Sequence, residues 1–216
     1  MYYAIIGDMK NSKTIINREE IQDKLKSVLK KINNTYSKDI AANFLITLGD
    51  EFQGLLQDAS HLLDILKHIQ REMYPVELRF GVGIGDMKTK INREAAIGAD
   101  GPAFYAARDM IIEMHNQERK LKKQAPNILL NYYEQASFEV TQINTMLLLL
   151  KTIEDSWNEK ERYTIWDMIC YQDSQEQCAK RQNTTQSTIA RRLAEGKYMV
   201  YTNALKTIDE AINEVE

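Results

Sequence analysis

The stretch Phe44-Leu45-Ile46-Thr47-Leu48-Gly49-Asp50-Glu51-Phe52-Gln53-Gly54-Leu55-Leu56 decides the fold of this chain. Two apolar runs flank Gly49-Asp50-Glu51, and a Gly-Asp dipeptide between such runs is typical of a tight turn. The sequence therefore predicts two antiparallel strands joined by a hairpin, with two acids at its tip.

The rest of the first half alternates strands and helices. Apolar residues at helical spacing predict helices over residues 18–33 and 62–73 and one beginning near Pro102, a favoured first-turn proline. Further strands are predicted at residues 2–7, 76–84 and 128–130. This order resembles the split βαβ ferredoxin-like plan, with helices on one face of an antiparallel sheet. We predict an α+β domain over residues 1–135 and an all-α domain over residues 136–216.

Composition limits the class of protein. The chain has 216 residues, of which 44% are hydrophobic and 27% charged, as in ordinary globular proteins. Its apolar run from Met146 to Leu150 is far shorter than the ~20 residues of a membrane helix, and the N-terminus lacks the basic leader of a signal peptide. We therefore expect a cytoplasmic protein with no membrane insertion and with Cys170 and Cys178 reduced.

Glycine and charge are unevenly distributed. Eight of the nine glycines fall between Gly7 and Gly101, which predicts a turn-rich first half and a helical second half. Between Cys178 and Lys206, six Lys or Arg accompany one acid, a net charge of +5, whereas the whole chain carries −3. The total therefore hides a basic C-terminal patch.

Acidic residues end the first strand and occupy the hairpin turn. Pairing of these strands in one sheet brings Asp8 to the same rim as Asp50 and Glu51. Mg²⁺ prefers one or two carboxylates together with phosphate oxygens, and Lys10 and Lys13 can add phosphate contacts. The alternative is that the turn acids belong only to the hairpin and that Asp8 caps a turn.

Two glycine-rich stretches favour the close approach of a backbone or a ligand. Gly81, Gly83 and Gly85 recur at period two and bare one face of a strand, against which either a helix or a ligand packs. A second stretch ends at Gly101 before a helix whose N-terminus can hold an anion. On that helix Arg108 is either a phosphate contact or a solvated charge.

Together these stretches resemble the class III nucleotidyl cyclase and GGDEF catalytic domains. The whole chain is similar to the SatD family of bacterial proteins, in which the stretches at residues 47–56 and 96–103 are recognisable. The stretches that carry the cyclase resemblance are Ile5-Ile6-Gly7-Asp8, Leu48-Gly49-Asp50-Glu51-Phe52, Arg79-Phe80-Gly81-Val82-Gly83-Ile84-Gly85 and Gly101-Pro102-Ala103-Phe104-Tyr105-Ala106-Ala107-Arg108.

The cyclase resemblance implies a cyclase-like domain that binds a nucleoside triphosphate with Mg²⁺ or Mn²⁺. Asp8 and Asp50 would hold the metal with Glu51 beside them, and Arg108 would stabilise the triphosphate. The residues assigned to the nucleotide are Lys10, Lys13, Gly49 and Gly101. Two positions depart from the patterns: Phe104 stands where cyclases carry a ribose-orienting asparagine, and Leu48 stands where GGDEF domains carry a glycine.

Residues 174–193 resemble the helix-turn-helix of bacterial regulators. Ala179 supplies the small residue where the two helices cross, and Asn183 supplies a turn residue that tolerates the left-handed conformation. Gln182 and Thr184 stand where apolar residues are usual.

The second helix of this motif would present polar side chains to the major groove of DNA. A glutamine amide suits adenine there, and arginine suits guanine. Expected base contacts are Gln186, Ser187, Ala190 and Arg191, and expected phosphate contacts are Thr185, Lys180, Arg181 and Lys197. The alternative is a helical hairpin that pairs two protomers. An apolar stripe at Leu205, Ile208 and Ile212 either closes the domain or forms a homodimer seam.

The joint presence of both motifs predicts a DNA-binding regulator whose cyclase-like domain binds a nucleotide with Mg²⁺. The alternative is an active nucleotidyl cyclase or nucleotidyltransferase that uses two metal-binding aspartates. A third hypothesis is a scaffold whose domains mediate protein contacts only.

Overall fold

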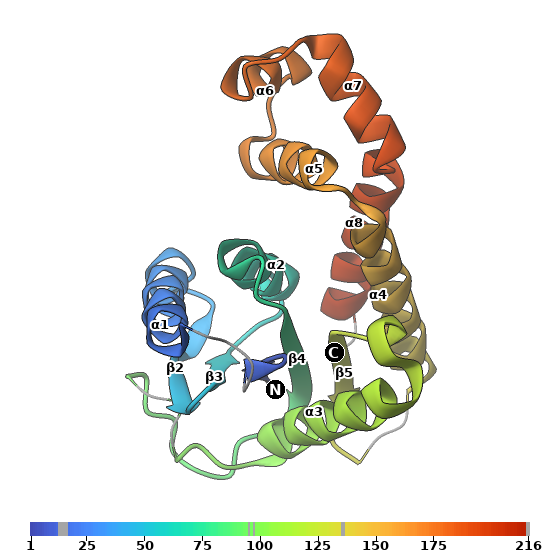
Figure 1. The fold of residues 1–216 in the computed structure, drawn as a ribbon. Helices are drawn as coiled ribbons and strands as arrows, with labels where there is room; N and C mark the ends of the chain where they lie inside the picture. The colour runs from blue at the N-terminus through green and yellow to red at the C-terminus, as the bar shows by residue number, and fades with distance from the viewer. Residues whose placement is uncertain (13–16, 95, 97, 135–136, 215–216) are drawn as a thin grey trace. The chain divides into compact units, whose positions relative to one another are not determined.

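The computed structural model describes residues 1–12, 17–94, 96, 98–134 and 137–214 (Figure 1). It has the predicted α+β class, with a five-stranded sheet and its helices followed by an all-helical region. The elements are β1 (Tyr2–Met9), α1 (Arg18–Thr35), β2 (Ile40–Leu48), β3 (Glu51–Leu56), α2 (Leu62–Met73), β4 (Leu78–Gly85), α3 (Pro102–Leu121), η2 (Lys122–Gln124), β5 (Ile128–Tyr132), α4 (Phe138–Ser156), α5 (Glu159–Tyr171), α6 (Gln175–Arg181), α7 (Gln186–Glu195) and α8 (Tyr198–Glu214).

The sheet has the strand order β2-β3-β1-β4-β5. Its first four strands pair antiparallel in the predicted ferredoxin-like order, and the predicted hairpin joins β2 to β3. The expectation of a purely antiparallel sheet is wrong, because β5 pairs parallel to β4. The connection through α3 returns the chain to the starting end of β4, which is what a parallel neighbour requires.

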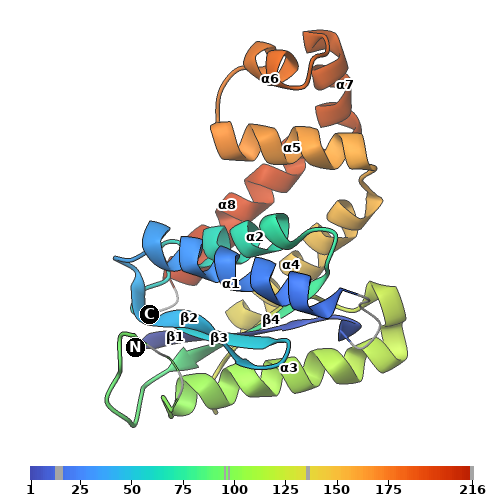
Figure 2. The same ribbon diagram turned by 60° about the vertical axis from the view of Figure 1, so that its left-hand side comes forward.

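Helices cover both faces of the sheet, so the expectation of helices on one face is also wrong. Figure 2 shows α1 and α2 on one face and α3 on the other. The glycine stripe explains the position of α3, because a Cβ added to Gly83 would lie 1.9 Å from the Ala103 carbonyl oxygen and one on Gly81 would lie 2.2 Å from that of Ala107. Of the two alternatives for this bare strand face, the structure therefore shows a helix.

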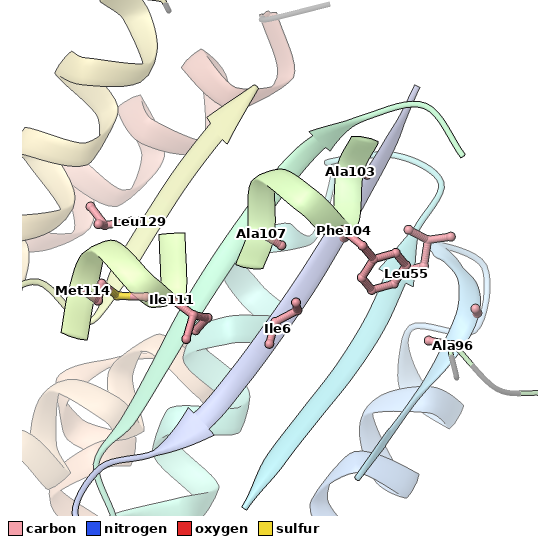
Figure 3. Packing of buried hydrophobic residues seen from close by; sticks show 11 residues of the cluster. Ile6, Leu55, Ala96, Ala103, Phe104, Ala107, Ile111, Met114 and Leu129 are labelled. Carbon is pink, nitrogen blue, oxygen red and sulfur yellow. The ribbon is translucent and has the colours of Figure 1, made fainter. Parts of the chain in front are cut away.

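A core cluster lies between α3 and the sheet (Figure 3). Apolar side chains of α3 pack there against the strands. The buried members are Ala4, Ile6, Ala42, Leu55, Ala96, Ala103, Phe104, Ala107, Ile111, Met114 and Leu129. This packing places one long face of α3 along β1 and β4.

The chain divides into two compact units, residues 1–148 with 209–216, and residues 149–208. This division differs from the predicted boundary after residue 135. The first half of α4 belongs to the sheet unit because the Asn144 side chain hydrogen-bonds both backbone groups of Leu130 in β5, at 2.9 and 2.8 Å.

Three further expectations concern single residues and the membrane. Cys170 is exposed and Cys178 is buried, both as free cysteines, and burial raises the pKa of the Cys178 thiol to about 12. Ile208 and Ile212 of the α8 stripe are buried within the single chain. Within the described residues, no helix is long and apolar enough to cross a membrane.

Candidate functional site

Asp8 and Glu51 form the centre of the predicted carboxylate rim. They are register partners in the β1–β3 pair, so their Cα atoms lie about 5 Å apart. Both lie on the face that α3 covers, because Ile6 and Leu55, at even spacing along the same strands, belong to the core cluster under α3. Strand pairing thus brings together two carboxylates that lie far apart in the sequence.

A buried arginine holds Asp8. Arg79 is the β4 register partner of Asp8, and its side chain, 7% exposed, donates from Nη1 to Asp8 Oδ1 at 2.8 Å. Arg79 Nε donates to Glu118 Oε1 on α3 at 3.1 Å, and His115 Nε2 lies 3.1 Å from Asp8 Oδ2. Asp8 is therefore clamped between β4 and α3.

Arg108 holds Glu51 from the same helix. Its two terminal nitrogens contact both carboxylate oxygens of Glu51, with 2.8 Å between Nη2 and Oε1. The hydrogen bonds to Glu51 raise the pKa of Arg108, against the lowering effect of burial, and the charge of Asp8 adds to the increase. A phosphate ligand would have to compete with Glu51 for this guanidinium.

Other predicted residues lie around the rim. Asp50 is on the turn, 4.0 Å from Arg18 at the start of α1, and Gly49 forms that turn at a φ of +66°. Lys10 pairs with Glu118 at 3.2 Å, so its ammonium is joined to the same charge network as Asp8.

Gly101 is not part of the rim. It packs against the Asp86 carbonyl just beyond the end of β4. This end lies about 20 Å along the strand from Arg79, because a strand rises ~3.3 Å per residue. The predicted anion site at the start of α3 is therefore at the opposite end of the sheet from Asp8. Lys13 lies outside the described residues.

Three members of this charge network were not predicted from the sequence: Arg79, His115 and Glu118. Two of them carry a weak signal in the spacing. Arg79 precedes Gly81 by two residues and so shares the face on which α3 packs. His115 follows Arg108 by seven residues, which is two helical turns and places both on one side of α3.

In the described part of the chain, the rim brings together two carboxylates and not a complete set of metal ligands. Among the described residues, no three His, Cys, Asp or Glu side chains gather to hold a metal ion. Asp8 and Glu51 supply two carboxylates, and Mg²⁺ in a nucleotide complex takes its other ligands from phosphate and water. A metal there would have to compete with Arg79 and His115 for Asp8, and with Arg108 for Glu51.

Helices α6 and α7 lie within the predicted helix-turn-helix segment and are joined by a short turn. Ser174 caps α6, and Thr185 caps α7 by accepting from the Thr188 amide at 3.3 Å. Between the helices Asn183 has a φ of 48°, so the predicted left-handed turn residue is confirmed.

A small core holds α6 and α7 against α5. Ala179 of α6 and Ile189 and Leu193 of α7 are buried, as is Ile165 of α5. The outer side of α7 is polar and open to solvent. The predicted DNA contacts Gln186, Ser187, Arg191, Thr185, Lys180 and Lys197 are exposed, and Ala190 is half-buried.

A sequence model of the SatD family matches residues 2–212. The chain belongs to the SatD family. The predicted family membership is therefore confirmed over nearly the whole chain. No curated protein matches it. Among solved structures, it is similar to the crystal structure of the guanylyl cyclase Cya2, with a TM-score of 0.37 at 12% identity over 60% of this chain and 73% of that one.

One residue of this SatD chain that departs from the helix-turn-helix pattern has a structural role. Gln182 accepts hydrogen bonds through Oε1 from the hydroxyl of Thr164, which is fully buried, at 2.9 Å and from Arg192 Nη1 at 2.9 Å. An apolar residue at position 182 would leave both donors without this acceptor. Gln182 thus joins α5 to the end of α7.

Replacing Gln182 with leucine is expected to lower the free energy of unfolding of the SatD protein's helical unit by about 1 kcal/mol, the net contribution of the hydrogen bonds that it accepts. The cost stays modest because Thr164 also donates to the Lys160 carbonyl and Arg192 also donates to Thr164 Oγ1. Urea unfolding followed by tryptophan fluorescence measures it, because Trp157 and Trp166 both lie in residues 149–208. Gln177→Leu on the exposed side of α6 is the control. Equal losses in the two variants would contradict the role of this network.

Arg181 is engaged inside the unit. Its guanidinium pairs with Asp167 of α5 at 2.6 Å and with Asp173, and it lies 4.1 Å from the centre of the Tyr171 ring. These contacts raise the pKa of Arg181, chiefly through the hydrogen bonds to Asp173 and Asp167. Arg181 therefore ties α6 to α5 in this SatD protein, whereas Lys180 and Lys197, which were predicted as phosphate contacts with it, are exposed.

Proposed function

We propose that this SatD protein is a DNA-binding regulator that inserts α7 into the major groove. The observation that carries the proposal is the three-helix arrangement of α5, α6 and α7, with its capped helices, left-handed turn at Asn183 and exposed polar face on α7. A recognition helix needs a buried side that fixes its angle and an exposed side that reaches base edges. Here Ile189 and Leu193 supply the first and Gln186 and Arg191 the second.

Charge supports the same proposal. Lys180, Arg191 and Lys197 are exposed, within a stretch whose net charge is +5 in a chain of net charge −3. Lysine and arginine side chains neutralise phosphates and release counterions, which makes binding fall steeply with salt. An acidic total charge is therefore compatible with a local DNA-binding surface.

Duplex DNA from the protein's own genomic locus is expected to bind the full chain with an affinity that falls as salt rises. Arg191→Ala should weaken binding about tenfold, because an arginine at a base edge contributes on that scale. Fluorescence anisotropy at two salt concentrations measures both effects. Arg119→Ala, an exposed arginine on α3, is the matched control. Absence of any salt-dependent binding would refute the proposal that the protein is a DNA-binding regulator.

The second part of the proposal is that the sheet rim binds a nucleotide with Mg²⁺ or Mn²⁺. Its support is the placement of Asp8 and Glu51 as register partners under the same helix that carries Arg108. When bound, the metal would neutralise phosphate charge. Asp8 and Glu51 would hold it, and Arg108 would exchange its carboxylate partner for a phosphate oxygen.

Phe104 favours nucleotide binding without catalytic turnover. The cyclase resemblance implies a ribose-orienting asparagine at this position, but Phe104 is 7% exposed and belongs to the core under α3. A buried phenyl ring supplies no hydrogen bond to a sugar. An active cyclase or nucleotidyltransferase therefore stays the alternative.

ATP or GTP with Mg²⁺ is expected to bind the wild-type chain in titration calorimetry, and Asp8→Asn should lose the metal-dependent part of the heat. Asp109→Asn, an exposed acid beside Arg108, is the control and should bind as wild type. Chromatography of the same mixtures separates the two hypotheses. A nucleotide product that forms with the wild-type chain but not with Asp8→Asn would establish an active enzyme instead of binding without turnover.

A further inference from the structure

A pair of glutamine side chains bridges the two helices of the helix-turn-helix. Gln175 is the first residue of α6 and Gln186 is the first residue of α7, each directly after the capping residue of its helix. Gln186 Nε2 donates to Gln175 Oε1 at 2.8 Å. This contact joins side chains eleven residues apart at the starts of the two helices.

The hydrogen-bonding capacity of Gln186 is only partly used in this pair. A side-chain amide carries two N–H donors and an oxygen acceptor. After donating to Gln175, Gln186 retains one N–H and its Oε1 on the same planar group. Adenine presents an acceptor at N7 and a donor at N6 to the major groove, which is the complementary pattern.

The side chains next to Gln186 are engaged with one another and not with Gln186. The Thr185 hydroxyl lies 3.0 Å from that of Ser187 and 2.9 Å from that of Thr188, so these side chains are engaged with one another around the helix start. Gln186 is exposed and extends beyond them to Gln175.

We propose that Gln186 reads an adenine in the major groove and that Gln175 is the positioning residue that holds its amide in the reading orientation. This inference rests on the proposed insertion of α7 into DNA. A free glutamine side chain must be ordered when it binds, and a side chain already held by a neighbour loses less conformational entropy.

Selection from a random duplex library with the full chain, followed by affinity measurements on the selected duplex, tests this inference. The selected site is expected to contain an adenine whose replacement weakens binding about tenfold. Gln186→Ala should abolish that discrimination. Gln175→Ala should reduce it about threefold while leaving binding to unselected DNA unchanged, because only the ordering of the amide is lost.

Two further variants make the result decisive. Gln186→Glu should shift the preferred base towards cytosine, whose amino group a carboxylate accepts. Gln177→Ala, an exposed glutamine on α6, should behave as wild type. DNA binding with the same base preference in wild type, Gln186→Ala and Gln175→Ala would overturn the adenine reading alone. Failure of every duplex to bind would overturn it together with the proposed function.

Discussion

Replacing Gly83 with alanine is expected to lower the free energy of unfolding of the sheet unit by about 3 kcal/mol or more, which is large for a single methyl group. The added Cβ would lie 1.9 Å from the Ala103 carbonyl oxygen and 2.4 Å from the Ala107 nitrogen. Both are backbone atoms of α3, so no side-chain rotation can relieve the overlap and the helix must move away from β4. Urea unfolding followed by far-UV circular dichroism measures the loss.

Gly98→Ala is the matched control for this variant. Apart from Gly98 and its chain neighbours, no atom of the described residues lies within 4 Å of a Cβ at Gly98, whose φ is +81°, so the left-handed backbone conformation is what opposes the substitution. The cost there should be about 1–2 kcal/mol. A Gly83→Ala protein as stable as Gly98→Ala would show that α3 does not lie directly on the strand backbone.

The Arg79→Met variant is expected to lose about 2–3 kcal/mol of unfolding free energy, because it leaves the half-buried carboxylate of Asp8 without its arginine partner. Arg79 is 7% exposed, and it contacts Asp8 and Glu118 from two different elements. Methionine keeps much of the apolar stem, so the loss reports mainly the missing charge. Denaturant unfolding of the full chain provides the measurement.

Arg119→Met is the control for the charge change. Arg119 lies on α3 beside Glu118 but is exposed, and such substitutions change stability by less than ~0.5 kcal/mol. If both variants unfold at the same denaturant concentration, the Asp8 carboxylate is solvated and its pairing with Arg79 contributes nothing.

Most of the fold could be predicted from local patterns. The hairpin around Gly49, the helical spacing of α1 and the proline at the start of α3 each depend on residues a few positions apart. The parallel pairing of β5 and the position of α3 on the second face could not be predicted in the same way. They depend on which distant element covers the bare strand at Gly81 and Gly83, and a glycine stripe is equally compatible with a helix or a ligand.

The candidate sites divide in a similar way. The turn at Asn183 and the caps of the helix-turn-helix follow from side chains that bond to their own backbone neighbourhood. For the partners of Asp8, the spacing of Arg79 and His115 indicates only the face on which each lies, because an ion pair between β1 and β4 or α3 depends on how these elements pack. The same is true of Gln182, which breaks the motif pattern and is explained only by Thr164 and Arg192.

By itself the sequence determined the α+β class, the family, the hairpin and the helix-turn-helix of this SatD protein, because strand alternation, helical spacing and turn residues act over short distances. The tertiary structure alone decided that Asp8 meets Arg79, that Glu51 meets Arg108 and that Gln186 meets Gln175. Hydrogen bonds and ion pairs act over only a few ångströms. The charged and polar partners of a residue are therefore set by how the elements pack, which no local pattern records.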